Sequence, residues 1–528
     1  VPIFMEKTVK TLEIMFGAIY AGCFYAIIDV HHPLARINKI METLKSDYIV
    51  TTRDYVETIK KIGYDGQLLI IEDICEDASG DSNKLEKIRE SHVAKSPLYC
   101  NFTSGSTGVP KGVLVGHESV IDFISCFTEL FDITENDVIG NQAPFDFDVS
   151  VKDIYSTIFT GAKMVIIPKR KFSFPMELMD YLCEHEVTTL IWAVSALCII
   201  STLNGFSYKI PGNVNKVIFS GEVMPIKHLN IWRKNLPEAK YINVYGPTEI
   251  TCNCTYYVIG KDEFKNNNEK IPIGKSFPNE DVFIINDNEE VICEAGIEGE
   301  ICVSGKCLAL GYYNNMEQTE KAFVKSVKDI NDIMYHTGDV GIYDENKNLV
   351  YMGRKDFQIK HMGHRIELGE IEQAMENISE ISRACVIFDK ENNCMVAFYR
   401  GNIEKRDIKK QLRETLPVFM IPTKFHNVEE FPLNKNGKID RNILMEEWKN
   451  QNSNKINKIV EKKEKVEINT PAFIFDEDVL LKHVDELEKK LGGSGEICYA
   501  MKANPFLISA LKDKVPYFEV CSPGELKI

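Results

Sequence analysis

The chain has 528 residues, of which 44% are hydrophobic and 27% charged, so it can form several packed domains of about 150 residues and is not a disordered chain. Its 62 Lys and Arg residues against 78 Asp and Glu residues give a net charge of −16, which makes nucleic acid a poor default partner. The 15 scattered cysteines indicate reduced thiols in a cytoplasmic protein. The apolar runs are shorter than a bilayer span, so we expect no membrane insertion. Because the chain begins with Val1, we expect a piece of a longer polypeptide.

Residues 1–354 alternate helical patterns with short strands rich in β-branched residues. Examples of the predicted strands are residues 48–51, 163–167 and 216–219. This alternation predicts α/β layers with largely parallel sheets. No sequence period of a repeat protein occurs, which excludes solenoids and propellers.

Three segments follow this part of the chain. Residues 355–448 are predicted to form a smaller α+β domain with a helix over 367–375 and strands over 384–388 and 395–399. The next 20 positions, 449–468, are rich in Lys, Glu and Asn, which is typical of a solvated linker or an exposed helix. The rest of the chain starts a new pattern of strand, helix and strand.

The most informative segment is the loop 101–112, which lies between the apolar stretches 98–100 and 113–115. It contains four hydroxyl residues, three glycines and one lysine. Glycines let backbone N–H groups converge on an anion, hydroxyls add donors, and lysine adds positive charge. Pro110 and Gly112 exclude a Walker A loop, which needs Gly and then Ser or Thr at these positions. On composition alone, an ordinary Ser/Gly turn fits equally well.

The loop resembles the phosphate loop of the adenylate-forming enzymes, which include adenylation domains of nonribosomal peptide synthetases, D-alanine–carrier-protein ligases and acyl-CoA synthetases. Further motifs that resemble this family follow in the family's order at residues 20–29, 147–150, 243–249, 335–339, 353–367, 416–422 and 436–441. The resemblance implies a large α/β domain of layered sheets and helices over 1–354, without the family's earliest motif. It also implies a small mobile α+β lid domain over 355–448.

The resemblance further implies that the chain binds ATP with Mg²⁺. The residues that would hold the β- and γ-phosphates are Thr103, Ser104, Gly105, Thr107, Gly108 and Lys111. Glu249 would carry Mg²⁺ with Thr248 and Thr107 close to the phosphates, and Lys438 would be the mobile cation between the substrate carboxylate and the α-phosphate. Judged by local sequence alone, Glu249 also fits a helix-start carboxylate, and Lys438 a solvated lysine in a tight turn.

Five residues would complete the nucleotide site by resemblance. Asn243 and Tyr245, followed by Gly246, would contact adenine, and Asp339 would accept the ribose hydroxyls. Arg354 would reach ribose or phosphate. The alternatives are a core tyrosine, a turn aspartate and a surface arginine, respectively.

The same resemblance assigns two residues to domain movement. Asp356 would be the hinge between the domains, and rotation about it would bring the segment around Gly363 to the position of Lys438 and admit a thiol.

Asp148 lies where aminoacyl-activating members of the family place a carboxylate against the α-ammonium group of the substrate, a contact that fatty acids cannot make. Asp146 is a rival, and a helix N-cap before residues 151–158 is the other interpretation. The remaining lining, carried over from the family, is Val149, Lys152, Ser195, Ile218, Ser220, Val244, Cys252 and Asn253. Lys152 would favour an acidic or polar side chain, or else extends out of the pocket to solvent.

The resemblance therefore implies that an amino acid reacts with ATP to give an aminoacyl adenylate and pyrophosphate. The aminoacyl group would pass to the phosphopantetheine thiol of a separate carrier protein. Residues 219–225 and 353–372 also look like D-alanine–carrier ligases, so a small amino acid remains open. An acyl-CoA synthetase is the alternative activity.

The C-terminal segment 469–528 resembles the start of the pyridoxal-phosphate (PLP) barrel decarboxylases of the diaminopimelate and ornithine types, through residues 470–473, 496–505 and 521–526. Lys502 ends a predicted strand and matches the lysine that forms the cofactor imine, although a plain strand-end lysine is the alternative. A β/α barrel needs roughly 200 residues or more. We therefore expect a truncated barrel here and PLP chemistry only in a full-length form, whose decarboxylase activity is a further alternative function.

Overall fold

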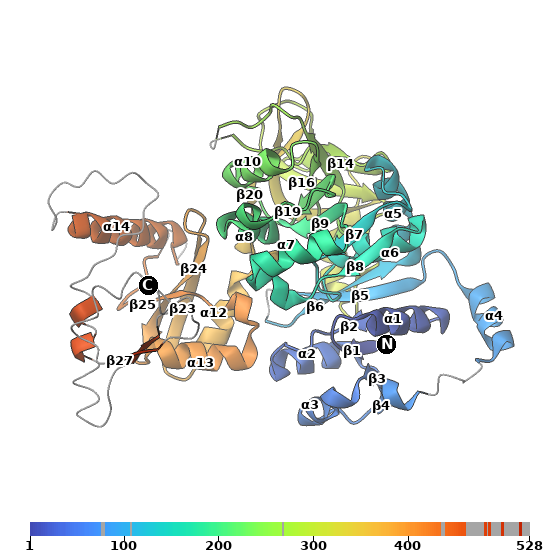
Figure 1. Cartoon of the computed structure of the whole chain (residues 1–528), viewed down its shortest axis with the longest axis horizontal. Helices are drawn as coiled ribbons and strands as arrows, with labels where there is room; N and C mark the ends of the chain where they lie inside the picture. Colours follow the sequence, from blue (N-terminus) through green and yellow to red (C-terminus); the bar gives the residue numbers. More distant parts are fainter. Residues whose placement is uncertain are drawn as a thin grey trace. The chain divides into compact units, whose positions relative to one another are not determined.

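The computed structural model describes residues 1–74, 80–105, 108–266, 269–433, 439–460, 480–482, 484–486, 498–500 and 517–519. The chain divides into two compact units, Val1–Met445 and Glu446–Ile528 (Figure 1). Three residues with predicted roles, Thr107, Lys438 and Lys502, lie outside the described residues.

The first unit begins with a parallel four-stranded sheet in the order β2-β1-β3-β4. Its strands are β1 (Pro2–Phe4), β2 (Ala26–Ile27), β3 (Tyr48–Thr51) and β4 (Gln67–Ile70), and the helices of this region are α1 (Val9–Tyr20), α2 (Leu34–Leu44), α3 (Val56–Lys61) and α4 (Ser82–Ser91). A smaller antiparallel group follows, made of β5 (Pro97–Thr103), β6 (Lys111–Gly116) and β17 (Gly311–Tyr312). The predicted phosphate loop is the connection between β5 and β6.

The central sheet has seven strands in the order β13-β12-β11-β10-β9-β7-β8. They are β7 (Val138–Asn141), β8 (Lys163–Ile166), β9 (Thr189–Ala193), β10 (Lys216–Ser220), β11 (Lys240–Tyr245), β12 (Thr255–Ile259) and β13 (Lys275–Ser276). Strands β7 to β11 pair in parallel, and β12 and β13 are antiparallel. The predicted parallel α/β architecture is confirmed, including the strands expected over residues 163–167 and 216–219.

Helices cover both faces of this sheet. They are α5 (His117–Leu130) and α6 (Val149–Thr160) on one face, and α7 (Pro175–Glu184), α8 (Val194–Thr202) and α10 (Ile226–Asn235) on the other, with the short α9 (Gly205–Tyr208) beside them. Neighbouring strand residues alternate between the two cores: Ile218 packs towards α5 and α6, and Phe219 towards α7, α8 and α10. Because parallel strands end at one edge, Ser220 and Tyr245 reach the same end of the sheet.

A further, antiparallel sheet carries two predicted nucleotide contacts. Its strands are β14 (Glu280–Ile285), β15 (Val291–Ile292), β16 (Gly299–Gly305), β18 (Phe323–Lys325), β19 (Ile333–Tyr343) and β20 (Leu349–Arg354), with α11 (Met316–Ala322) before β18. Asp339 on β19 is the register partner of Arg354 at the end of β20. Pairing of the two strands therefore places these side chains next to each other.

The predicted smaller α+β domain is also confirmed. It starts with the hairpin of β21 (Gln358–His361) and β22 (His364–Glu367), and continues through α12 (Leu368–Glu376), β23 (Ile381–Asp389), β24 (Cys394–Gly401), α13 (Lys405–Thr415) and β25 (Lys424–Asn427). It has its own core, in which Ile371 and Met375 of α12 pack with Val386 of β23. The predicted helix over 367–375 and both predicted strands agree with these bounds.

The end of the chain is described only in part. Helix α14 (Arg441–Val460) covers the first part of the segment expected to be a linker or an exposed helix. In the second unit, β26 (Cys498–Ala500) pairs in parallel with β27 (Tyr517–Glu519). Among the described residues, no helix is both long enough and apolar enough to cross a membrane.

Candidate active site

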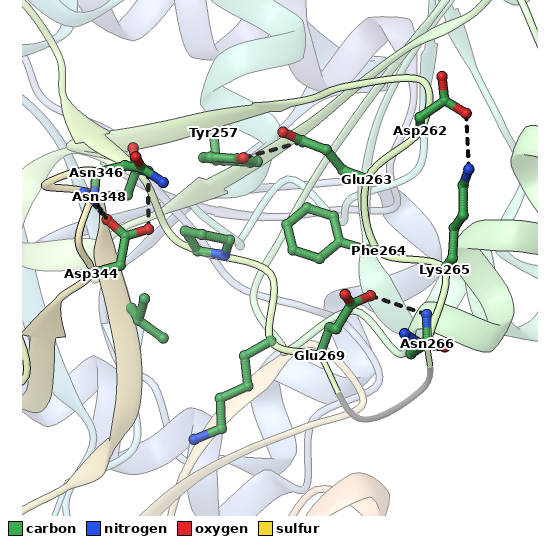
Figure 2. Close-up of a pocket in the computed structure, with 13 residues that line it drawn as sticks. Tyr257, Asp262, Glu263, Phe264, Lys265, Asn266, Glu269, Asp344, Asn346 and Asn348 are labelled. Atoms are coloured by element: carbon green, nitrogen blue, oxygen red, sulfur yellow. Dashed lines mark hydrogen bonds and ion pairs between the residues drawn. The ribbon is translucent and has the colours of Figure 1, made fainter.

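A surface pocket next to β12 is distinct from the predicted site. It is lined by residues of the connection after β12 and of the turn between β19 and β20, and Figure 2 shows Tyr257, Glu263, Phe264 and Asp344 around it. Its side chains pair mostly with one another, as in the 3.1 Å hydrogen bond from the Tyr257 hydroxyl to Glu263. None of the described residues that line it is a predicted site residue, so the predicted site lies elsewhere in the chain.

The phosphate loop is tightly folded, and its first glycine has no room for a side chain. A Cβ atom on Gly105 would lie 2.0 Å from the carbonyl oxygen of Val109. Gly108 has φ +69°, and its N–H donates to the Gly105 carbonyl at 2.9 Å. The buried hydroxyl of Thr103 has no hydrogen-bond partner in the described part of the chain. Thr103 therefore keeps a hydroxyl donor available beside a turn that depends on glycine.

Two groups of the small domain bind to this loop. The Ser104 hydroxyl donates to the backbone carbonyl of Arg365 at 2.7 Å, and the Gly105 N–H interacts with the carboxylate of Glu370 on α12. Glu370 also forms a buried 3.1 Å ion pair with Arg36 of α2. Burial raises the pKa of Glu370 despite Arg36. The loop thus already binds an oxygen anion, and that anion belongs to the protein.

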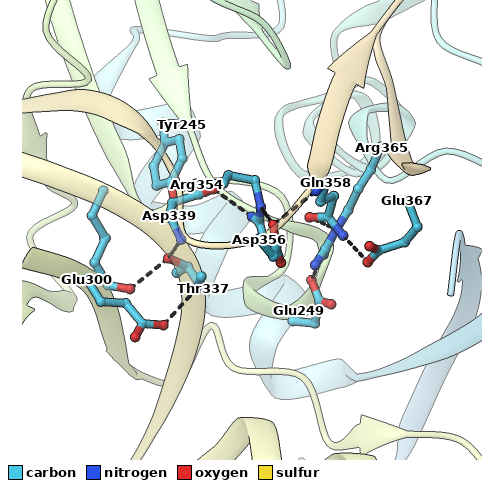
Figure 3. A network of polar contacts seen from close by, with 12 residues as sticks. Tyr245, Glu249, Glu300, Thr337, Asp339, Arg354, Asp356, Gln358, Arg365 and Glu367 are labelled. Atoms are coloured by element: carbon cyan, nitrogen blue, oxygen red, sulfur yellow. Dashed lines mark hydrogen bonds and ion pairs between the residues drawn. The ribbon is translucent and has the colours of Figure 1, made fainter. Parts of the chain in front are cut away.

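Glu249 lies in a short turn of 3₁₀ helix after β11, and its side chain is completely buried. It accepts a hydrogen bond from the Tyr312 hydroxyl at 2.8 Å. It also accepts one from Arg365 at 2.6 Å (Figure 3). Burial would raise the pKa of Glu249, but Arg365, Tyr312 and Lys111 outweigh it and hold the pKa below its ordinary value. The carboxylate is therefore ionised although it is buried. The helix-start interpretation does not explain this ionisation.

An ionised carboxylate of this kind suits Mg²⁺, which keeps several water ligands and needs only one or two carboxylates beside the phosphates. No cluster of three or more His, Cys, Asp or Glu side chains that would hold a metal by itself occurs in the described ranges. Glu249 fits a metal held jointly with a nucleotide. Coordination by its second oxygen would require Arg365 to move away.

The predicted ribose contact is a buried network in this structure (Figure 3). Asp339 accepts hydrogen bonds from the Tyr245 hydroxyl at 2.5 Å and from Arg354 at 2.6 Å. Arg354 also holds the carboxylate of Asp356 through two nitrogens, at 2.6 and 2.8 Å. The Arg354 side chain is only 8% exposed, so its interpretation as a surface arginine is wrong.

The Tyr245 ring is buried in the core, and burial raises the pKa of its hydroxyl. The hydroxyl donates a hydrogen bond to Asp339. The neighbouring Asn243 side chain donates to the Pro272 carbonyl at 2.8 Å. Gly246 lies so close to the next turn that a Cβ atom would be 2.6 Å from the Asn253 Cα. The end of β11 therefore packs closely against the turn that carries Asn253.

The predicted substrate residues come together at the start of α6. Asp148 is buried and is the N-cap residue of α6, but its side chain makes no cap hydrogen bond and interacts with the Thr248 hydroxyl instead. The N-cap interpretation therefore accounts for its position but not for its side chain. Burial raises its pKa, although Thr248, Lys152 and Lys360 oppose the shift. The rival Asp146 instead lies 3.6 Å from the ring of His32.

Lys152 lies one turn further along α6, and its side chain is buried, so its interpretation as a solvent-extended lysine is wrong. Its ammonium donates to Asn253 at 2.7 Å and to Ser220 at 3.3 Å. The Cys252 thiol donates to the Asp148 carbonyl. Further buried predicted residues on α6 and on strands β10 and β11 are Val149, Ile218 and Val244.

The tip of the β21–β22 hairpin lies beside this group. Gly363, with φ +80°, has its N–H donating to Glu222 at 3.0 Å. A Cβ atom on Gly363 would lie 3.2 Å from Ala193 and 3.6 Å from the Ser195 hydroxyl. Two predicted residues from different domains, Gly363 and Ser195, are therefore neighbours.

Three charged residues of the small domain were not among the predicted site residues: Lys360, Arg365 and Glu370. Lys360 lies 5.2 Å from the centre of the Tyr245 ring, and burial lowers its pKa despite its attraction to Asp339. Lys360 and Arg365 are register partners across the hairpin, so they share one face. Recognising the hairpin in residues 353–367 would have predicted this shared face, but not which acids it contacts.

Comparison with known proteins identifies the family. Residues 1–313 match the AMP-binding enzyme family, and residues 370–438 match the AMP-binding enzyme C-terminal domain. The chain is 32% identical over 455 residues to zwittermicin A synthase ZmaJ of Bacillus cereus, covering 84% of each protein. It is 29% identical over 451 residues to tyrocidine synthase 1 of Brevibacillus parabrevis, but spans only 40% of that protein's length.

The fold has a solved relative as well. The Vibrio cholerae adenylation domain AlmE, in complex with glycyl-adenosine-5'-phosphate, superposes with a TM-score of 0.71 at 20% identity over 85% of this chain and 89% of AlmE. At this identity the likeness shows the fold alone. The sequence matches carry the assignment: this chain belongs to the AMP-binding enzyme family, whose members are ATP-dependent ligases that form acyl adenylates.

Proposed function

We propose that this chain adenylates an amino acid and then transfers the aminoacyl group to the phosphopantetheine thiol of a separate carrier protein. In the first half-reaction, a substrate carboxylate oxygen bonds to the α-phosphorus of ATP, and the bond to the β-phosphate breaks as pyrophosphate leaves. In the second, a thiolate sulfur bonds to the acyl carbon and AMP leaves with the bonding electrons. Negative charge builds up on phosphate oxygens, so the enzyme must supply preorganised cations and N–H donors.

The nucleotide would be held where these donors and charges converge. The phosphate loop and Lys111 would bind the β- and γ-phosphates, and Glu249 with Thr248 would hold Mg²⁺, joined by Thr107. Asn243 and Tyr245 would contact adenine. Asp339 would accept the ribose hydroxyls and Arg354 would support it, which is in keeping with the ion pair between them. When bound, Mg²⁺ would neutralise phosphate charge.

The observation that carries the amino acid assignment is the buried carboxylate of Asp148. The carboxylate lies close to the Thr248 hydroxyl and within electrostatic range of Glu249, the next residue along the chain. A group bound to Asp148 would therefore lie beside the nucleotide site. A buried carboxylate needs a cationic partner, and the α-ammonium group of an amino acid supplies one. A fatty acid would leave Asp148 unpaired, which disfavours the acyl-CoA synthetase alternative.

The contacts of the small domain support an arrangement that follows pyrophosphate release. Glu370 is bound to the Gly105 N–H, and Arg365 is bound to Glu249, where ATP phosphates and Mg²⁺ would otherwise be. Gly363 is next to Ser195, as expected of the segment that admits the thiol. We propose that rotation at Asp356 exchanges this arrangement for one in which Lys438 enters the site.

ATP–pyrophosphate exchange with a panel of amino acids and fatty acids tests the proposed function. We expect exchange with at least one amino acid and none with fatty acids. Asp148→Asn should lower kcat/KM for the amino acid by roughly 100-fold, because it removes the buried counter-ion, while the KM for ATP stays within about threefold. Exchange that occurs with fatty acids and not with amino acids would reject the assignment.

A second candidate activity is decarboxylation by a longer polypeptide that would contain this chain. The parallel pairing of β26 and β27 is in keeping with the start of a β/α barrel, and the strand that Lys502 would follow is β26. In such a form, PLP would supply an electron sink for decarboxylation and Lys502 would hold it. Imine absorbance on adding PLP to the longer polypeptide, lost in Lys502→Ala, is the test.

A further inference from the structure

The cation Lys152 has no task in the chemistry proposed above. Its side chain is 1% exposed, and its ammonium donates to Asn253 and Ser220 only, within the part of the chain that the structure describes. An ammonium group has three N–H donors, so one remains for a ligand. Both partners are neutral.

A buried ammonium without a bonded anion is costly to maintain. Among the described residues, no carboxylate lies within ion-pair distance of Lys152; Asp148 and Asp153 act on it only through space. Asp153 faces away, since it accepts a 2.6 Å hydrogen bond from the Asn141 amide. The charge of Lys152 is therefore left for something that binds in the site.

The position of Lys152 relative to Asp148 limits what that ligand is. Asp148 is the N-cap residue of α6 and Lys152 follows four positions later, so the two lie on the same side of the helix start. Asn253 follows two residues with positive φ, Thr251 and Cys252, and this turn aims its amide oxygen at the ammonium. The site thus presents an anion for an α-ammonium group and, one helical turn away, a cation.

We propose that Lys152 is the counter-ion of a carboxylate in the substrate side chain, so the enzyme activates an α-amino acid with an acidic side chain. This inference rests on the proposed function, because it takes Asp148 as the partner of the α-ammonium group. The α-carboxylate then points to the nucleotide and the second carboxylate to Lys152, with Asn253 and Ser220 orienting the ammonium. Neutral amides of the same size lack the charge that Lys152 needs.

The first test compares acidic amino acids with their neutral isosteres in ATP–pyrophosphate exchange. We expect kcat/KM for aspartate, glutamate or 2-aminoadipate to exceed that for asparagine, glutamine and leucine by about 100-fold or more. Lys152→Met should remove this preference by lowering kcat/KM only for the acidic amino acids. Preference of the wild type for a neutral amino acid would overturn the inference and leave the proposed function intact. Exchange with no amino acid would overturn both.

A second variant guards against a Lys152→Met protein that fails to fold. Asn253→Asp places a carboxylate where the amide oxygen now lies 2.7 Å from the ammonium, so the lysine stays buried and paired. We expect a melting temperature equal to or above that of the wild type and loss of the acidic preference. Retention of the preference in this folded variant would reject the role of Lys152.

The matched control is Lys216→Met. Lys216 begins β10, the strand that ends at Ser220, and its ammonium pairs with Asp137 at 2.8 Å. Removing this partly buried lysine should lower the melting temperature without changing the ratio of acidic to neutral kcat/KM. A changed ratio in this control would show that the selectivity follows general destabilisation, and would overturn the inference.

Discussion

The substrate half and the nucleotide half of the candidate site are built in different ways. Asp148, Lys152, Ser220 and Asn253 all belong to the large domain, and their hydrogen bonds close within it. On the nucleotide side, the phosphate loop and Glu249 are bound by groups of the small domain. The proposed substrate half is therefore formed within the large domain alone, whereas the proposed nucleotide half depends on where the small domain lies.

The difference has an electrostatic cause. Arg365 and Glu370 satisfy Glu249 and the Gly105 N–H in the present arrangement, so neither group is left buried without a partner. ATP and Mg²⁺ would satisfy the same groups in the other arrangement. Exchange of one set of partners for the other would let the domain move, as we propose, without exposing an unpaired charge, while the substrate half would stay unchanged.

The largest effect is expected for Lys438→Ala, which removes the cation that we propose the small domain brings for adenylation. Pyrophosphate exchange should fall by about 100- to 1,000-fold, because a preorganised charge at the reacting phosphate is lost. Transfer from a supplied aminoacyl adenylate to the carrier should survive. If both half-reactions fell equally, the two arrangements would not divide the chemistry as proposed.

A smaller effect is expected for Arg365→Met, which breaks the pair with Glu249 that stabilises the present arrangement. Transfer to the carrier should slow by about tenfold, while exchange is retained because Mg²⁺ can still compensate Glu249. Single-turnover thioester formation measures transfer to the carrier, and ATP–pyrophosphate exchange measures adenylation.

The control for this variant is Arg383→Met, which changes an arginine of the same domain whose side chain is 60% exposed. It should alter neither half-reaction. An Arg365→Met protein that transfers at the wild-type rate would show that the pair with Glu249 does not hold the domain.

The smallest effect is a difference in pH dependence between the two halves. The pKa of Asp148 is raised by burial above its ordinary 3.8, so this carboxylate loses its charge early as pH falls. The pKa of Glu249 is held below its ordinary 4.5 against burial, chiefly by Arg365, so it stays ionised. Between about pH 7.5 and about pH 5, the KM for the amino acid should therefore rise while the KM for MgATP stays nearly constant. Parallel changes in both KM values would contradict this separation.

Much of the fold was predictable because its signals are local. The strand over residues 216–219 and the helix over 367–375 were placed almost to the residue, since alternation and helical periodicity report burial directly. The tight phosphate loop followed from its glycines. The ion pair of Arg365 with Glu249 was not predictable, because it joins residues 116 positions apart in different domains.

The sequence by itself determined the α/β layers, the order of the motifs and the residue types available to the site, because these depend on periodicity and turn chemistry within short segments. The tertiary structure alone decided what two polar residues do. Asp148 reads locally as a helix cap and Lys152 as a solvated lysine, yet both are buried against residues about a hundred positions away, such as Thr248 and Asn253. Burial and the partner residues set the pKa values of these two side chains, and the burial and the partners arise only when the chain is folded.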